Sequence, residues 1–300
     1  MDWRAIGMGL AFVVMWSSAF TSAKIAVEYA PPFLILAVRF FLSGGIAVGL
    51  AWMLGQRAVL TGRQWLAVGL FGICQNTIYL GANFVAAQWI DASVAVVIAS
   101  LLPLLVAAFS ALFLGERLAR IAVLGLVAGL AGSLVVMGDR IAGGADMRGV
   151  AICVVGVIAL MIATLLVRGA SPGGNVLMIV GLQMLVGAVT LLPLSLALEV
   201  WEVTWTWQLI AAFTYTTLVP GLTATVTWFF LVKRIGPTRA ATFHFLNPFL
   251  GVAIAAMVLG SVFYALPAFA DTIDGLGAVI LPLLLAGAGI VASIIGKFFV

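Results

Sequence analysis

Segments without a charged side chain follow one another along almost the whole chain, and most are about 20 residues long. An α-helix needs about 20 mostly apolar residues to cross a hydrocarbon core of roughly 30 Å. Stretches such as IAVLGLVAGLAGSLVVM are apolar on every side, which disfavours the period-2 strands of a transmembrane barrel. The pattern predicts an all-α polytopic membrane protein with ten transmembrane helices, at 5–24, 33–54, 64–86, 92–114, 120–138, 148–168, 175–198, 207–231, 239–260 and 276–296.

Composition agrees with this prediction, because 65% of the residues are hydrophobic and only 8% are charged, against about 25% charged in soluble domains. The first apolar segment could instead be a cleaved signal peptide, but its apolar run is longer than the roughly 7 to 15 residues typical of such peptides. Cys74 and Cys153 both fall within predicted helices, outside any CxxC motif, and are interpreted as small apolar residues.

The positions of Lys and Arg predict the orientation. With the N-terminus in the cytoplasm, ten basic residues lie on the inner side and three, Lys24, Arg140 and Arg148, lie outside, with Arg39 set aside inside a helix. Short cytoplasmic loops are enriched in Lys and Arg, so both termini are expected to be cytoplasmic. The net charge of +4 therefore requires no nucleic-acid partner.

The chain repeats itself at an offset of 145 residues. SLLPLLVAAFSALFLGE (100–116) aligns with FLNPFLGVAIAAMVLGS (245–261), so that Pro103 matches Pro248. An odd number of helices, five, separates the copies, which inverts the second relative to the membrane. We therefore expect two inverted five-helix units, 1–140 and 146–300, as in many secondary transporters, although a duplication could also be retained only for packing.

Three short motifs carry a resemblance to a known family. They are MWSSAF in the first helix, AVRFFLSGG in the second and LGE at the end of the fourth. With the five-plus-five pattern, the chain resembles the drug/metabolite transporter superfamily and its ten-helix EamA type. It is most similar to the YddG-type bacterial exporters of aromatic amino acids, which implies an inner-membrane location. One departure is Ser261, which stands where the second copy should repeat the acid of LGE.

Several functions are disfavoured by what the predicted helices lack. No Asp or Glu lies mid-span, although an intramembrane carboxylate is the usual proton carrier of antiporters. The four-helix multidrug antiporters of the superfamily use a Glu in their first helix, where this chain has none. The sequence contains no Walker A loop, so no ATPase is expected. It also lacks a metal or catalytic constellation, so we expect neither an enzyme nor a cofactor. An intramembrane enzyme with His244 as base, and a channel, remain as less favoured alternatives.

Polar and aromatic residues inside helices are the candidates for a substrate site. Asn76, Tyr79 and Asn83 are spaced to share one helical face, which either lines a cavity or packs against another helix. Tryptophans often anchor helices at the interface, but Trp16 lies near mid-span. The substrate-binding candidates are Trp16, Asn76, Tyr79, Asn83, Tyr215, Trp228, His244 and Asn247.

His244 is the only histidine of the chain. It could be a satisfied packing group, but a membrane-buried His is costly unless it faces a partner or water. A proline removes the hydrogen bond to the carbonyl four residues before it, so Pro248 would free the carbonyl of His244. Pro103 and Pro248 are therefore candidate hinge residues.

Arg39 lies about six residues inside its predicted helix. It could snorkel to the headgroups, or it could face an outer gate or a substrate carboxylate. It is therefore the third gating candidate, beside the two prolines.

These observations lead to one functional hypothesis. The chain is expected to be a facilitative carrier that exports aromatic and other large neutral amino acids by alternating access. Aromatic rings can stack on the substrate, and amides and His can hydrogen-bond a zwitterion. The alternative is a proton-coupled multidrug or metabolite exporter that uses His244. The expected partners are the substrate and the lipid bilayer, and a monomer suffices.

Overall fold

The computed structural model describes residues 2–115, 146–170 and 175–251 except Pro248, with isolated positions at 123–131 and 253–254. Every regular element in these residues is helical, and seven segments are long and apolar enough to cross a membrane. The all-α polytopic fold predicted from the sequence is therefore confirmed. The predicted helices at 120–138 and 276–296 lie outside the fully described ranges, as does Pro248.

The seven spans agree with the predicted ones to within four residues at their ends, and the largest difference is the end of the last, at Ile235 against the predicted 231. They run over Trp3–Val27, Pro32–Met53, Gly62–Ala86, Val94–Phe113, Met147–Val167, Val176–Leu198 and Trp207–Ile235. The elements are α1 (Trp3–Val27), α2 (Pro32–Met53), α3 (Gly62–Gly72), η1 (Ile73–Leu80), α4 (Gly81–Ala86), α5 (Ala92–Ala99), α6 (Leu102–Phe113), α8 (Met147–Ala170), α9 (Val176–Leu198), α10 (Trp207–Thr216), η2 (Thr217–Thr223), α11 (Ala224–Ile235), α12 (Pro237–Ala241) and η3 (Thr242–Leu246).

Local sequence signals set several helix ends. The Asp2 carboxylate accepts a hydrogen bond from the Ala5 amide at the start of α1, and Thr61 and Gln64 form a capping box at the start of α3. The first amides of α2 are capped from a distance, because the Glu199 carboxylate accepts bonds from Phe33 N (2.6 Å) and Leu34 N (2.9 Å). Glu199 thus ties the end of α9 to the start of α2.

Three of the seven described spans are not regular α-helices throughout. The third contains the π-helix η1 and the seventh contains the π-helix η2. In a π-helix the backbone hydrogen bonds span five residues instead of the four of an α-helix. The fourth breaks into α5 and α6 at Ser100 and Leu101, directly before Pro103. A further irregular segment, outside these spans, is the 3₁₀ helix η3. Three of the candidate site residues lie in these irregular segments, namely Asn76 and Tyr79 in η1 and His244 in η3.

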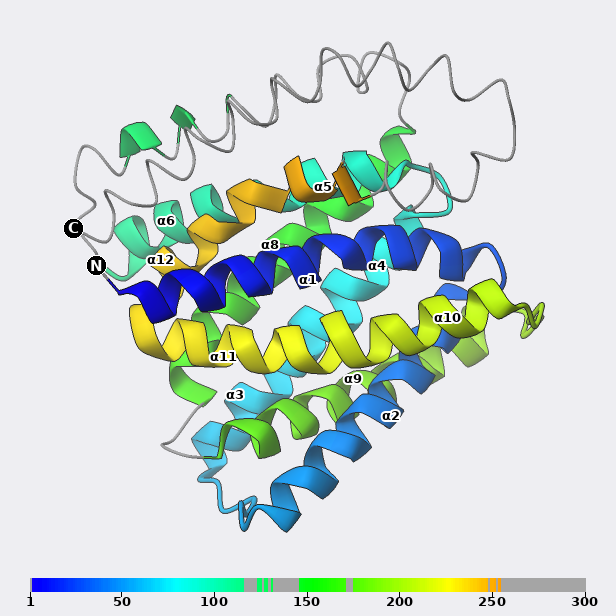
Figure 1. The fold of residues 1–300 in the computed structure, drawn as a ribbon, viewed down its shortest axis with the longest axis horizontal. Coiled ribbons are helices and arrows are strands. Elements are labelled where there is room, and N and C mark those ends of the chain that lie inside the picture. Colours follow the sequence, from blue (N-terminus) through cyan, green and yellow to red (C-terminus); the bar gives the residue numbers. More distant parts are fainter. Residues whose placement is uncertain are drawn as a thin grey trace.

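The helices surround the candidate residues on several sides. α1 lies beside α10 and α11 across the face shown in Figure 1, while α8 packs behind it against α3, η1 and α4. α2 packs along α9 at closely spaced glycines, because Gly44 and Gly181 meet backbone to backbone. Small residues allow such close approach between membrane helices. The interior between α1, η1, α11 and η3 is filled by aromatic rings.

Candidate functional site

An aromatic cluster occupies the centre of the described helices. It consists of Phe12 and Trp16 from α1, Tyr79 from η1, Trp228 from α11 and His244 from η3. Phe12 lies against Trp16 (5.3 Å between ring centroids), Trp228 (4.7 Å) and His244 (5.4 Å). Trp16 stacks on Tyr79 at 6.2 Å with an interplanar angle of 4°. Four predicted substrate residues, far apart in sequence, are therefore brought together.

The fifth candidate of this group, Asn247, connects the cluster to α1 by hydrogen bonds. Asn247 Nδ2 lies 2.8 Å from His244 Nδ1, and Ser17 Oγ donates to Asn247 Oδ1 at 3.1 Å. In this orientation of the Asn247 side-chain amide its oxygen accepts from Ser17 and its nitrogen faces the imidazole. The nitrogen can only donate, so the orientation pairs with the His244 tautomer in which Nδ1 accepts and Nε2 carries the proton.

The backbone of this segment differs from the expectation drawn from its proline. The carbonyl of His244 is not left free, because the backbone N–H of Asn247 donates a hydrogen bond to it, as in a 3₁₀ helix. Asn247 provides this donor one residue before Pro248, which itself lies outside the described residues. The His244 side chain, and not its carbonyl, is thus the group of this segment that faces the aromatic rings.

A small cavity adjoins the cluster and is narrow in this conformation. Its free volume is about 30 Å³, comparable to the share of volume that one water molecule takes in the liquid. It cannot hold an amino acid without widening. Its wall consists of Trp16, Ala19, Phe20, Ala23, Arg39, Tyr79, Leu80, Asn83, Phe84, Ala87, Ala95 and Pro220.

Arg39, predicted as a gating residue, lies on the wall of this cavity. Its side chain is only 3% exposed, so the structure does not show it snorkelling to the headgroups. Its Nε and Nη1 atoms have no hydrogen-bond partner among the described residues. The guanidinium carbon lies 5.2 Å from the centroid of the Phe40 ring.

The polar stripe of the third span divides between two environments. Asn83 is on the cavity wall, with its Nδ2 donating to the Tyr79 carbonyl at 2.8 Å. Asn76 instead faces α9, where its Nδ2 donates to the backbone carbonyl of Gln183 at 2.8 Å and to its side-chain oxygen. Of the two interpretations, lining a cavity fits Asn83 and Tyr79, whereas helix packing fits Asn76.

Replacing Asn76 by alanine is expected to lower stability and to leave substrate affinity unchanged. The substitution removes a donor shared by two Gln183 oxygens, and hydrogen bonds between membrane helices contribute about 0.6 kcal/mol on average. The measurement is thermal unfolding in detergent, beside Asn175→Ala as a control on an exposed amide that bonds the Arg57 carbonyl. Weaker substrate binding at unchanged stability would instead assign Asn76 to the transport path.

Tyr215 is not on the cavity wall. It lies on α10, where its hydroxyl shares a 2.7 Å hydrogen bond with Ser18 of α1, and its side chain is partly exposed. In this conformation it holds α10 against α1. Sequence reasoning had grouped it with Trp228 because both are aromatic residues of the same predicted helix, but η2 separates them.

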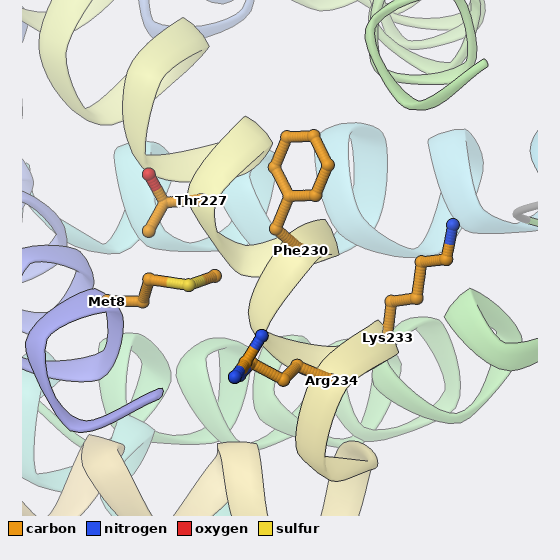
Figure 2. Close-up of a pocket in the computed structure, with 5 residues that line it drawn as sticks. All are labelled: Met8, Thr227, Phe230, Lys233 and Arg234. Atoms are coloured by element: carbon orange, nitrogen blue, oxygen red, sulfur yellow. The ribbon is translucent and has the colours of Figure 1, made fainter. Parts of the chain in front are cut away.

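A larger hollow of about 540 Å³ lies near the start of α1. Figure 2 shows that its labelled residues are Met8 of α1 and four residues of α11, namely Thr227, Phe230, Lys233 and Arg234. Arg234 is bound to Asp2 by an ion pair of 2.6 Å, and the pKa of the Asp2 carboxyl is lowered by this hydrogen bond. None of the predicted site residues lines this hollow.

Sequence reasoning missed one residue of the cluster, Phe12, and one residue that is bonded to its neighbour Asn247, Ser17. Phe12 lies four residues before Trp16, so the i, i+4 spacing that places them on one face of α1 could have revealed it. Ser17 gave no signal, because its bond to Asn247 joins residues 230 positions apart in the chain.

The known proteins that this chain resembles are transporters. The EamA-like transporter family matches residues 3–138. An uncharacterized transporter of Archaeoglobus fulgidus is 24% identical over 90% of this chain and 93% of its own length. The aromatic amino acid exporter YddG of Ancylobacter novellus is 36% identical, but over 45% of this chain and 47% of its own length. The inner membrane transporter YedA of Escherichia coli is 24% identical over 83% and 80% of the two chains.

A solved structure shares the fold over the whole length. This crystal structure is 23% identical, covers 99% of both chains and gives a TM-score of 0.72. This likeness shows the fold, while the resemblance noted in the motifs of the sequence is supported by the family match at residues 3–138 and by the transporter relatives. The chain is a multi-pass membrane transporter, and its residues 3–138 match the EamA-like transporter family.

Proposed function

We propose that the protein is a facilitative carrier that exports aromatic and other large neutral amino acids across the bacterial inner membrane by alternating access. The main support is the aromatic cluster beside the cavity, in which Trp16 and Tyr79 belong to both. Aromatic faces favour stacking with a flat side chain. The partial similarity to an aromatic amino acid exporter points the same way. The distribution of Lys and Arg favours cytoplasmic termini.

One face of α1 borders the larger hollow, the aromatic cluster and the small cavity in turn, and the substrate would move along it. Met8 borders the larger hollow, Phe12 and Trp16 belong to the cluster, and Ala19 and Ala23 border the small cavity. These positions are three or four residues apart and therefore share one side of the helix. With the N-terminus in the cytoplasm, the hollow would be the inner vestibule and the cluster the barrier between it and the cavity.

Alternating access requires two units that can move relative to each other, and we propose that 1–140 and 146–300 are inverted repeats. The π-helices support this proposal, because η1 begins at Ile73 and η2 at Thr217, 144 residues apart against the sequence offset of 145. The break before Pro103 and the 3₁₀ segment η3 also correspond within this offset. π-Helical turns are frequent at functional sites, and both carry residues of the cavity wall.

The environment of His244 favours transport without proton coupling. His244 Nδ1 accepts a bond from the Asn247 amide, and none of the ring partners described for His244 is charged. No acidic residue lines the small cavity among the described residues. A proton-coupled multidrug or metabolite exporter, the alternative, would need a group on the path that gains and loses a proton.

Counterflow in proteoliposomes tests the proposed function directly. Vesicles loaded with unlabelled phenylalanine are expected to accumulate labelled phenylalanine, tryptophan and leucine, at the same initial rate with and without a pH gradient. Protein-free vesicles and vesicles with unlabelled glycine inside serve as controls. Absence of exchange for every large neutral amino acid would contradict the substrate class. Exchange that requires the gradient would keep the carrier and replace facilitated transport by proton coupling through His244.

A further inference from the structure

Arg39 is a buried cation without a matching anion. Its side chain is 3% exposed, and its Nε and Nη1 atoms lack hydrogen-bond partners among the described residues. A charged side chain within a membrane span is costly, and such residues usually pair with another group or face a water-filled path. The Phe40 ring at 5.2 Å offers a weak cation–π contact but no hydrogen bond. The guanidinium therefore has unused donors directed into the protein.

The fold keeps space beside this guanidinium. Gly221 of η2 lies next to it, and a Cβ atom at that position would come within 3.2 Å of Arg39 Nη2 and 3.3 Å of Nε. Pro220, its neighbour in η2, is on the cavity wall with Arg39, Trp16 and Tyr79. Arg39 thus shares the wall of the cavity with the stacked aromatic pair.

The charged side chains that line the proposed path among the described residues are Arg39, Lys233 and Arg234, of which Arg234 is paired with Asp2. The described wall of the small cavity contains Arg39 and no Asp or Glu. Lys24 lies in the last turn of α1. Its ammonium group donates a 2.6 Å hydrogen bond to the carbonyl of Ala87, a residue of the cavity wall. The larger hollow contains Lys233, which is exposed. A carboxylate is attracted along this path, whereas an ammonium group meets no partner of opposite charge.

We propose that Arg39 binds the carboxylate of the substrate and that the amino group is not required, so that the site accepts aromatic monocarboxylates in general. Arginine presents paired N–H donors in a planar geometry that fits a carboxylate. The aromatic ring of the substrate would stack on Trp16 and Tyr79. The inference uses the proposed amino acid transport to place the site, but the carboxylate preference can be tested apart from it.

Ligands that lack one of the two charged groups separate the possibilities. Binding to the detergent-solubilised protein is measured by thermal stabilisation for phenylalanine, 3-phenylpropionate and phenethylamine, so membrane permeation plays no role. 3-Phenylpropionate keeps the carboxylate and is expected to bind within a few-fold of phenylalanine. Phenethylamine keeps only the amine and is expected not to bind. The reverse ranking, or equal binding of both, overturns the proposal without any variant.

Substitution of the arginine assigns the preference to this side chain. Arg39→Gln is expected to weaken binding of both carboxylates about tenfold or more, which is the loss of one charge-assisted hydrogen-bonded contact. Arg39→Lys, which keeps the charge without the paired donors, is expected to be intermediate. Arg57→Gln is the matched control, because it removes the same charge from an exposed arginine in the loop after α2. If Arg39→Gln does not fold, Arg39→Lys and the series of three ligands still test whether Arg39 binds the carboxylate.

The outcomes for the carrier and for the carboxylate site are distinct. Phenylalanine counterflow with unchanged carboxylate affinity in Arg39→Gln and Arg39→Lys would overturn the carboxylate site and leave the amino acid carrier intact. Arg39-dependent binding of 3-phenylpropionate without exchange of any amino acid would support the site and overturn the proposed substrates. If the protein neither exchanges amino acids nor binds 3-phenylpropionate, the proposed carrier and the proposed carboxylate site are both overturned.

Discussion

Replacing Gly181 by leucine is expected to prevent the protein from folding into a monodisperse particle. A Cβ atom at Gly181 would approach Val48 Cγ2 to 2.7 Å, Val48 N to 2.8 Å and the Gly44 carbonyl oxygen to 3.0 Å. Two of these three atoms belong to the backbone of α2 and cannot move aside by a change of rotamer. The helices must therefore separate along their whole contact, and the rest of the leucine side chain has no space. Gly181→Ala, which adds only the Cβ atom, is expected to destabilise by about 1–3 kcal/mol.

The comparison uses fluorescence-detected gel filtration for folding and thermal unfolding in detergent for stability. Gly45→Leu is the matched control, because Gly45 adjoins Gly44 on α2 and a Cβ atom there meets nothing within 4 Å. This control is expected to elute and unfold like the unmodified protein. If Gly181→Leu behaved like Gly45→Leu, the close approach of α2 and α9 would be wrong.

The sequence could predict the spans but not this contact. Gly44, Gly45 and Gly49 look alike within α2, and only the structure shows that the first faces α9 while the other two face open space. Apolar length is a local property that depends on the bilayer. The rotation of each helix depends on all its neighbours, and a chain that is apolar on every side gives no periodicity from which to infer it.

The candidate site was predictable in part for the same reason. Polar or aromatic residues at membrane depth are rare enough to be noticed, which identified Trp16, Tyr79, Trp228, His244 and Asn247. Their grouping depends on contacts between distant segments. The different fates of Asn76 and Asn83 also depend on η1, since a π-helix turns successive residues by a smaller angle than the α-helical spacing assumes.

For Arg39 the sequence indicated three possible roles but could not distinguish between them. Its depth within α2 allowed snorkelling, a gate or a carboxylate contact, and each was compatible with the segment AVRFFLSGG. The structure removes the first possibility for this conformation by burying the side chain. It also places Gly221, a residue 182 positions later in the chain, beside the guanidinium. No local pattern could have predicted that neighbour.

Replacing Trp16 by alanine is expected to reduce phenylalanine exchange at least tenfold and to remove the preference for aromatic over aliphatic substrates. Trp16 stacks on Tyr79 and meets His244 edge to face at 6.0 Å, so it joins the cavity to the cluster. Aromatic pairs contribute about 0.5–1.5 kcal/mol beyond the burial of area, and about 1.4 kcal/mol corresponds to a factor of ten. Loss of the ring removes both the stacking surface and part of the barrier between cavity and hollow.

The ratio of phenylalanine to leucine exchange separates this role from a merely structural one. Removing a buried tryptophan also costs stability, by about 3–5 kcal/mol, and a loosened protein would lose both activities in proportion. Loss of stacking lowers phenylalanine exchange more, because leucine has no ring. Trp16→Phe keeps a ring and is expected to retain the preference, and Trp3→Ala, at an exposed position of the same helix, is expected to change neither rate. An unchanged ratio in Trp16→Ala would exclude the stacking role and leave Trp16 as a packing residue, because substrate selectivity can be set only by groups that contact the substrate differently.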